Sequence, residues 1–303
     1  MTDPDPTAPD LETRAAAVVD ACRAGSLAGP MALTRLLMLA DAEEDARGLL
    51  SRLAADEPDT PCWRDLLALL AARPTAFATV KGLLSAVVHG APRAGGPDAA
   101  IAATAAMFDR AVALSPEGGV ALYSLGDPTL LAAATDELVR FMEAQGLLRQ
   151  DYDVLEIGCG IGRIMAALAG RVRSVHGLDI SPAMVAEAKA RCAGLPNATV
   201  ALTDGRDLST LDEETFDLVL AIDAFPYLVD AGGDVVARHV AEAARVLRPG
   251  GRLLVVNYSY RDDPAADRAD FEALGRAAGL QPLAADDTPF RLWDGRVYLA
   301  RRP

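Results

Sequence analysis

Three glycines, separated by single residues, mark the segment of this 303-residue chain that best suits ligand chemistry. Residues 153–164 read DVLEIGCGIGRI, so a strand-like run leads directly into Gly158, Gly160 and Gly162, and a helical pattern follows. Glycine lets a backbone turn tightly and approach a ligand with no side chain in between, and the start of the following helix offers free N–H groups. We therefore predict a nucleotide or nucleoside site at this strand–turn–helix unit.

The spacing of the glycines separates two kinds of nucleotide site. The dinucleotide fingerprint G-x-G-x-x-G requires glycine at position 163, where this chain has arginine. The segment resembles instead the glycine motif of class I S-adenosylmethionine-dependent methyltransferases, which hold a nucleoside with an amino-acid tail. This resemblance implies that Glu156 and Cys159 join the glycines in the cofactor site. Glu156 must find partners in a buried strand, and in the family this acidic residue helps order the loop and the charged end of the ligand.

Two acidic positions follow at the ends of later strand-like runs. Asp179, followed by Ile180, ends the run 175–179, and a carboxylate can accept two adjacent hydrogen bonds, as the two hydroxyls of a ribose require. Asp204-Gly205-Arg206 closes the next run, where the family often places an acidic residue that accepts from the adenine amino group, followed by a backbone N–H that meets the ring nitrogen. The alternatives are a helix cap for Asp179 and a plain turn at 204–206.

The run 216–228, FDLVLAIDAFPYL, is similar to the fourth motif of the same family. The resemblance implies that Ile222 lies in the cofactor site, under the methionine part. It also implies that Asp223 and Tyr227 lie near the transferred methyl as candidate catalytic residues, and that Phe225 contacts the substrate. In many relatives the position of Tyr227 is polar and often histidine, and here the chain departs from that pattern.

The remaining candidates are chosen by their place in the expected fold. His239, in a predicted helix, is a third candidate base, and its alternative is a packed or solvated helix histidine. Tyr258 and Tyr260 follow the fifth strand-like run, at the sheet edge where ligands bind, and Trp293 adds aromatic surface from a later loop. Tyr123 precedes the first strand, where many relatives place a residue that holds the amino-acid end of the cofactor.

These residues need a scaffold in which strand ends meet. After Asp151, short apolar runs alternate with helical patterns, which predicts βαβ units and a mostly parallel sheet. Residues 244–256, ARVLRPGGRLLVV, resemble the family segment after the fourth strand, and two late runs, 281–284 and 296–300, predict a hairpin at one edge. The expected fold class is α/β: a Rossmann-like class I methyltransferase sheet, mostly parallel with an antiparallel last strand, behind an all-helical N-terminal extension.

The N-terminal half carries helix start signals rather than strand patterns. Thr60-Pro61 and Asp127-Pro128 each place a cap residue before a proline at the first helical position. We expect a disordered acidic tail at residues 1–12, a helical domain at 13–146 and a cofactor-binding methyltransferase domain at 147–303. The helical domain is expected to act as a lid, a substrate cap or a homodimerisation surface.

Composition narrows the range of partners. The formal net charge is −14, so phosphate backbones and anionic lipid surfaces repel the chain, and nucleic acid is a poor default partner. There is no apolar run of about eighteen residues and no signal-peptide pattern at the start, so we expect no membrane association. Four cysteines without a C-x-x-C pair, together with three scattered histidines, predict no metal site and a reducing, cytoplasmic location.

The resemblance implies methyl transfer from S-adenosyl-L-methionine, which leaves S-adenosyl-L-homocysteine, to an O, N or C atom of a small-molecule metabolite by in-line displacement. Two alternatives stay open. One is an aminopropyl transferase on the same fold, and the other is a non-catalytic protein that binds the cofactor and uses its helices for interactions. A cluttered or absent substrate pocket above Asp223 and Tyr227 would favour the non-catalytic alternative.

Overall fold

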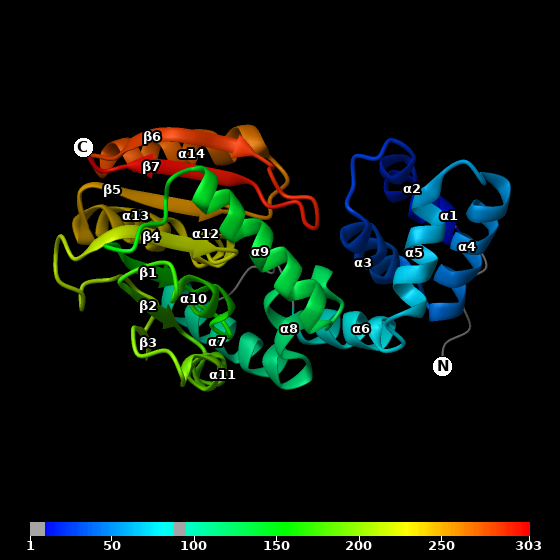
Figure 1. The fold of residues 1–303 in the computed structure, drawn as a ribbon, viewed down its shortest axis with the longest axis horizontal. Helices are drawn as coiled ribbons and strands as arrows, with labels where there is room; N and C mark the ends of the chain where they lie inside the picture. The colour runs from blue at the N-terminus through cyan, green and yellow to red at the C-terminus, as the bar shows by residue number, and fades with distance from the viewer. Residues whose placement is uncertain (1–9, 88–94) are drawn as a thin grey trace.

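The computed structural model describes residues 10–87 and 95–303, which contain a seven-stranded sheet with helices on both faces (Figure 1). The strands are β1 (Asp153–Ile157), β2 (Ser174–Asp179), β3 (Ala198–Leu202), β4 (Phe216–Ile222), β5 (Leu247–Val256), β6 (Gln281–Asp287) and β7 (Val297–Arg301). Their order is β3-β2-β1-β4-β5-β7-β6. Strands β1 to β5 are parallel, and β7 is antiparallel to both β5 and β6. The predicted fold, with its antiparallel edge, is confirmed.

The described helices run as follows: α1 (Leu11–Arg14), α2 (Ala16–Arg23), α3 (Gly29–Leu39), α4 (Glu43–Asp56), α5 (Pro61–Ala71), α6 (Ala76–Ala86), α7 (Gly96–Leu114), α8 (Pro116–Val120), the 3-10 turn η1 (Leu122–Ser124), α9 (Pro128–Ala144), α10 (Arg163–Leu168), α11 (Pro182–Cys192), α12 (Phe225–Asp230), α13 (Gly233–Val246) and α14 (Pro264–Ala277). Both cap signals mark the start of a helix, but only Asp127 caps its helix through its side chain, because Thr60 makes no side-chain cap hydrogen bond. Thr60 and Asp127 are the N-cap residues of α5 and α9, and Asp127 accepts hydrogen bonds from two backbone N–H groups of α9.

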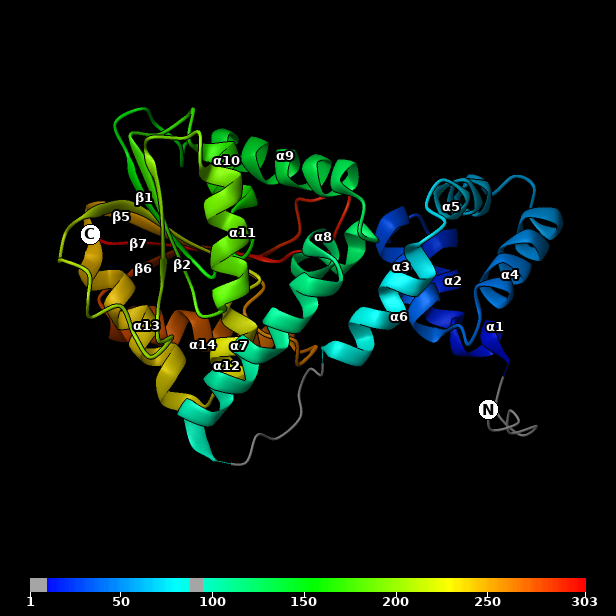
Figure 2. The ribbon, with the colours of Figure 1, turned by 90° about the horizontal axis from the view of Figure 1, so that it is seen from below.

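Two helical layers enclose the sheet (Figure 2). Helices α9, α10 and α11 share a core with one face, where Val154 and Leu218 are fully buried, and α12, α13 and α14 share a core with the other face, where Leu155 and Val219 are fully buried. Parallel strands that are buried on both faces need nearly continuous apolar sequence, which β4 and the last four residues of β5 provide.

The N-terminal helices fall into two groups. Helices α1 to α6, residues 11–86, surround a separate core around Leu33, Leu37 and Trp63, to which Leu125 after η1 also belongs, and we call these helices the cap bundle. Helices α7 to α9 instead belong to the core of the sheet, because residues such as Val112 and Leu131 pack in the same cluster as the strands. The hydrophobic core therefore does not divide at residue 146, where the sequence predicts a domain boundary.

The cap bundle lies beside the carboxyl-end side of the sheet (Figure 1). Its contacts run from α3 to η1 and from α6 to α7 and α8. Within the described residues, two ion pairs join it to the rest of the chain: Arg35 of α3 to Asp294 at 2.6 Å, and Arg73 to Asp127 at 2.7 Å.

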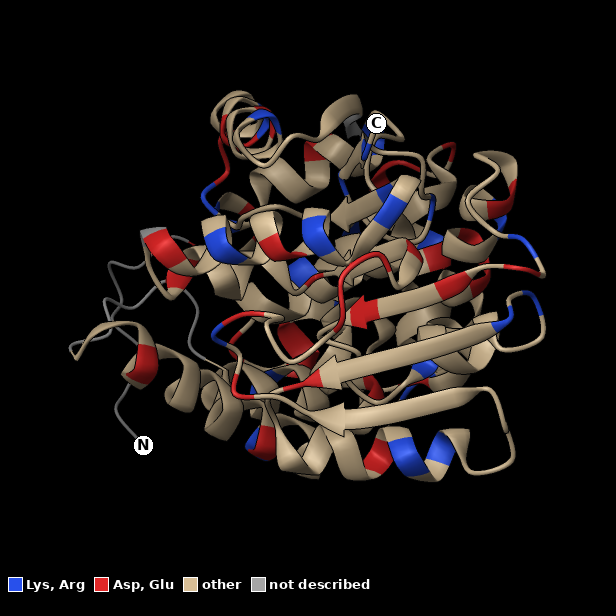
Figure 3. Ribbon diagram, turned by 90° about the vertical axis from the view of Figure 1, so that its left-hand side faces the viewer, with Lys and Arg blue, Asp and Glu red and all other residues tan. Residues whose placement is uncertain are grey.

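At the N-terminal end, Asp10 caps α1 by accepting a hydrogen bond from the backbone N–H of Thr13 at 2.8 Å. Residues 11 and 12 of the predicted tail are therefore helical, and residues 1–9 lie outside the described part. Among residues 10–87 and 95–303, no single helix combines the length and apolar composition needed to cross a bilayer. Helices α5 and α6 together have that length and composition, but the pair is bent by 82°. On the side drawn in Figure 3, acidic and basic residues are interspersed, without a continuous basic stripe.

Candidate cofactor and substrate site

The glycine loop after β1 has the backbone that only glycine adopts freely. Gly158, Gly160 and Gly162 have φ angles of 70°, 53° and 73°, in the left-handed region. A Cβ on Gly158 would lie 2.7 Å from the Cβ of Ala224, and a Cβ on Gly160 would lie 2.8 Å from Val120. A Cβ on Gly162 would instead crowd α11, which indicates that this third glycine allows the loop and α11 to pack closely.

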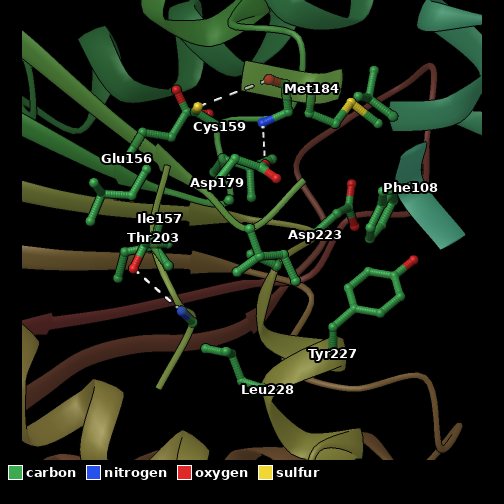
Figure 4. A pocket seen from close by; sticks show the side chains of 18 of the residues that line it. Phe108, Glu156, Ile157, Cys159, Asp179, Met184, Thr203, Asp223, Tyr227 and Leu228 are labelled. Atoms are coloured by element: carbon green, nitrogen blue, oxygen red, sulfur yellow. Dashed lines mark hydrogen bonds between the residues drawn. The ribbon is translucent and has the colours of Figure 1, made fainter. Parts of the chain in front are cut away.

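This loop forms one wall of a cavity at the carboxyl ends of β1, β2 and β4, which we call the glycine-loop cavity (Figure 4). The structure brings most of the predicted cofactor residues together in its wall: Glu156, Gly158, Cys159, Gly160, Asp179, Ile180, Gly205 and Ile222. Gly162, Asp204, Arg206 and Tyr123 are not among the residues that line it.

Asp179 ties the glycine loop to the end of β2. Its carboxylate accepts hydrogen bonds from the backbone N–H of Gly160 at 2.8 Å and of Ser181 at 2.9 Å. The side chain is only 7% exposed, and burial raises the pKa of Asp179. Each carboxylate oxygen has a second acceptor position, so Asp179 can still accept hydrogen bonds from a ligand in the cavity.

Glu156 and Arg163 bring two ionisable groups into the same wall. Glu156 is 2% exposed, and its Oε2 has no hydrogen-bond partner among the described residues. Burial raises the pKa of Glu156 to about 8, against the opposing influence of the nearby Arg163 guanidinium. Arg163 is 9% exposed and donates from Nη1 to Thr135 at 2.9 Å. A buried acid and a buried cation with so few partners suit a ligand that carries both charges.

Helix α7 supplies part of the cavity that sequence reasoning missed. Thr104 and Phe108, four residues apart on one helix face, line the cavity. Asp109 fixes the helix in place by accepting hydrogen bonds from the Ser181 hydroxyl at 2.6 Å and from the backbone N–H of Ala183 at 3.0 Å. No local motif marks these residues, because their role depends on how α7 packs against α11.

The loop after β3 places its glycine, but not its charged residues, in the cavity wall. Gly205 has φ 73°, and a Cβ there would lie 2.6 Å from Cγ2 of Ile180. The Asp204 carboxylate instead accepts a hydrogen bond from the backbone N–H of Arg206, and Arg206 pairs with Asp98 of α7 at 2.9 Å. The side chains of Asp204 and Arg206 are more than half exposed, so the contact with adenine that we expect from them does not follow from this geometry.

Asp223 and Tyr227 stand where a second cavity begins. Asp223, at the end of β4, has φ 57°, and its Oδ1 accepts a hydrogen bond from Asn257 Nδ2 at 2.6 Å. Burial raises the pKa of Asp223 to about 6. The Tyr227 ring packs against Phe108, with 4.9 Å between ring centroids, and Figure 4 shows both rings beside Asp223.

The second cavity, which we call the cap cleft, has a volume of about 460 Å³. Its walls come from α3 and α6 of the cap bundle, from η1, and from the loops after β5 and before β7. Tyr123, Tyr260 and Trp293 line this cleft. The structure therefore places Tyr123 beside Trp293, at 5.5 Å between ring centroids, rather than in the glycine-loop cavity.

The structure separates three other candidates from this group. Phe225 and Tyr258 are 0% and 2% exposed, pack in the core with Phe271 and Tyr298, and line neither cavity. His239 does line the glycine-loop cavity, and its Nδ1 donates to the carbonyl of its own helix at 2.9 Å.

The electrostatic surroundings of His239 differ from those of Asp223. Its charged neighbours are Asp207 and Asp204, in the loop after β3, and Arg238 of its own helix, and burial lowers the pKa of its imidazole. His239 therefore lies near the loop after β3, where Gly205 lines the cavity, and Asp223 is not among its charged neighbours.

Comparison with known proteins agrees with this geometry. Residues 155–255 match the family described as a methyltransferase domain. The demethylmenaquinone methyltransferase of Tropheryma whipplei is 37% identical over 108 residues, which span 36% of this chain and 42% of that protein. The 2-methyl-6-phytyl-1,4-hydroquinone methyltransferase of Synechocystis is 34% identical over 147 residues, which span 46% of this chain and 44% of that protein. This chain thus spans less than half the length of both relatives.

A solved structure shows the same fold. The phosphoethanolamine N-methyltransferase 1 of Haemonchus contortus, in complex with phosphoethanolamine and S-adenosylhomocysteine, superposes with a TM-score of 0.56 at 16% identity, over 68% of this chain and 49% of that one. With the strand order, the glycine loop and the family match, these findings show that the chain contains a class I methyltransferase domain, the class whose cofactor is S-adenosylmethionine.

Proposed function

We propose that the protein transfers a methyl group from S-adenosylmethionine to an O, N or C atom of a small molecule held in the cap cleft. One observation carries this proposal: the glycine-loop cavity and the cap cleft share Phe108, Val120, Asp223 and Tyr227 in their walls. A donor bound in the first cavity and an acceptor bound in the second would meet at these side chains. Such positioning of two reactants supplies much of the rate gain in a displacement reaction.

The residues of the glycine-loop cavity fit the cofactor part by part. Asp179 would accept hydrogen bonds from the ribose hydroxyls, and Ile180 and Gly205 would border the adenine. Glu156, whose Oε2 has no partner among the described residues, would accept a hydrogen bond from the ammonium of the amino-acid tail, and Arg163 would donate to its carboxylate. The ammonium and the carboxylate of the ligand would then neutralise the buried charges of Glu156 and Arg163.

The bound cofactor supplies an electrophilic methyl group on a positively charged sulfur. The chain's own residues would orient the acceptor and remove its proton where it has one. Asp223 and Tyr227 stand at the shared wall for this role, and the cap bundle would keep water from the reacting atoms.

Two alternatives are less well supported. A non-catalytic cofactor-binding protein needs no acceptor site, whereas a cleft of about 460 Å³ adjoins Asp223 and Tyr227. An aminopropyl transferase uses a decarboxylated cofactor, and a buried Arg163 in the cavity wall favours a ligand that still carries its carboxylate.

The test is isothermal titration of S-adenosylmethionine and S-adenosylhomocysteine into the parent protein and into the Asp179→Ala variant. We expect micromolar binding to the parent and a loss of about 2–3 kcal/mol in the variant, because hydrogen bonds to a charged group are removed. Asp136→Ala, on the exposed face of α9, is the matched control and should bind as the parent does. Absence of binding to a folded parent protein would refute the proposal. Decarboxylated S-adenosylmethionine is titrated in the same way, and its tighter binding would favour aminopropyl transfer.

A further inference from the structure

Aromatic and acidic side chains are concentrated in the lining of the cap cleft. Five of its fifteen Phe, Tyr and Trp residues line the cleft, and so do five aspartates against two arginines. Aromatic faces and carboxylates both attract cations, and neither attracts an anion.

The charges that remain for a ligand are acidic. Arg35 is already paired with Asp294 at 2.6 Å. Asp267 is paired with Arg261 at 2.7 Å, and Asp263 caps α14 through the backbone N–H of Ala266. Arg296, the other arginine of the lining, also has an interaction within the chain, so neither arginine is free and three of the five carboxylates are engaged within the described residues.

Two carboxylates keep free capacity. Asp262, in the left-handed region with φ 54°, has no hydrogen bond or ion pair among the described residues. Asp223 receives Asn257 and the Tyr260 hydroxyl on the same oxygen, Oδ1, which leaves Oδ2 for a ligand. Asp223 is also the only one of the five aspartates that lines both cavities within the described chain.

Aromatic rings surround this carboxylate. The Tyr227 ring contacts Phe108 at 4.9 Å and Tyr260 at 6.1 Å between centroids, in both cases edge to face. Figure 4 shows Phe108 and Tyr227 beside Asp223, and the Tyr260 hydroxyl lies 3.5 Å from its Oδ1, so a cation beside Asp223 would lie close to rings whose faces attract cations.

The cleft also contains two buried polar groups that no described residue satisfies. The Tyr123 hydroxyl and the Trp293 Nε1 have no hydrogen-bond partner among the described residues, and these side chains are only 7% and 3% exposed. Both side chains line the cleft. Both groups can donate, so an acceptor oxygen on the ligand would satisfy them. They are independent of the acidic cluster and also point to a bound ligand.

From these observations we propose that the methyl acceptor is an amine, bound as its ammonium ion between Asp223, Asp262 and the rings of Phe108, Tyr227 and Tyr260. This inference rests on the proposed function and narrows it to N-methylation. The opposite wall of the cleft, formed by Met31, Met38, Leu83, Leu84 and Val87, suits an apolar body attached to the amine.

The reaction balances with the groups at hand. The ammonium ion gives one proton to the Asp223 carboxylate and becomes a neutral amine with a free lone pair. That lone pair forms the new N–C bond as the C–S bond breaks, and the electron pair of the C–S bond remains on sulfur. The product leaves as a methylated ammonium ion, and Asp223 returns its proton to solvent.

The inference is tested by binding as well as by turnover. We would titrate 2-phenylethylamine, 2-phenylethanol and 3-phenylpropionate, which share a shape but differ in charge, into the protein saturated with S-adenosylhomocysteine. Trp293 lines the cleft and Trp63 is buried in the cap bundle, so a change in tryptophan emission reports on the cleft. We expect the amine to bind roughly tenfold more tightly than the alcohol or the carboxylate at neutral pH.

Two variants test whether Asp223 and Asp262 cause the preference for the amine. Asp223→Asn and Asp262→Asn should each weaken amine binding by roughly three- to tenfold and leave the alcohol unchanged, because they remove charge but keep shape. Asparagine also tolerates the left-handed backbone at both positions. Asp136→Asn is the control and should change none of the three ligands.

Equal binding of the three probes, a preference for the alcohol or the carboxylate, or no emission change with the amine at millimolar concentration would overturn the inference. Cofactor titration, carried out separately, distinguishes this failure from failure of the proposed function. Intact cofactor binding without amine preference refutes only the substrate class, whereas loss of cofactor binding in the folded parent refutes both.

Discussion

The hydrogen bond between Asn257 and Asp223 leads to a prediction about the pH dependence of methyl transfer. Both residues have left-handed backbones, with φ 61° and 57°, at the ends of adjacent strands β5 and β4. The backbone N–H of Arg296 donates to Asn257 Oδ1 at 2.9 Å, so the amide nitrogen must face Asp223, to which it donates at 2.6 Å. This hydrogen bond favours the ionised carboxylate and opposes the effect of burial, and the pKa of Asp223 is raised only to about 6.

The perturbation is Asn257→Gly, because glycine accepts the left-handed backbone and removes only the side chain. A hydrogen bond to a charged group contributes about 1.5–3 kcal/mol, and one pH unit corresponds to about 1.4 kcal/mol. We therefore expect the pKa of Asp223 to rise by about one to two pH units. The ionised base is then lost at higher pH, so the acid limb of kcat/KM moves upward by the same amount, while activity on the alkaline plateau is retained.

Two measurements check this: the pH profile of methyl transfer between about pH 5 and 9, and the carboxyl 13C shift of Asp223, which needs no substrate. The variant leaves unchanged the other groups that act on Asp223 or lie beside it, namely Arg163, Asp294, Tyr227 and Tyr260. Tyr260→Phe should give a smaller shift, because its hydroxyl lies at 3.5 Å. If Asn257→Gly lowers activity equally at every pH, Asn257 has a structural role only, and the reasoning fails.

Three further outcomes follow from the cofactor side. Between its ordinary pKa of 4.5 and its buried pKa of about 8, Glu156 is protonated in the folded protein and ionised in the unfolded chain. It therefore destabilises the fold increasingly as the pH rises through that window. The Glu156→Gln variant should be thermally more stable than the parent at pH 8 but not at pH 4. Gly205→Ala combines φ 73° with a Cβ 2.6 Å from Ile180, and chemical denaturation should show a loss of about 1–3 kcal/mol, contradicted if stability is unchanged. Arg163→Met should weaken S-adenosylmethionine binding about tenfold or more, while adenosine, which has no carboxylate, binds as before in calorimetry; equal losses for both ligands would argue against a carboxylate contact.

The α/β part of the fold could be predicted from sequence because its signals are local. Alternation of apolar runs with helical patterns located all seven strands, and the glycine spacing located the loop between β1 and α10. The position of Asp179 and Asp223 in the cavity wall could be predicted because Asp179 ends β2 and Asp223 directly follows β4, and parallel strands carry their ends to one edge of a sheet.

The substrate candidates show why the rest could not be predicted. Phe225 and Tyr227 are two residues apart in α12, so on a helix they face nearly opposite directions, and only Tyr227 reaches the cavities. After β5, the left-handed turn at Asn257 breaks the strand alternation, so Tyr258 enters the core while Tyr260 lines the cleft. Thr104 and Phe108 depend on how α7 packs against α11, which no local pattern encodes.

The separate core of the cap bundle has a consequence for how specificity can diversify. Residues 11–86 supply the apolar wall of the cap cleft but line no part of the glycine-loop cavity, whereas α7 supplies a wall of both. The part of the chain that forms both cavities therefore extends upstream of the family match at residue 155 and includes α7. On the proposed function, a chimera that exchanged only residues 11–86 is expected to change which acceptor binds in the cap cleft and to leave cofactor binding unchanged, which would make the cap bundle a replaceable determinant of acceptor specificity.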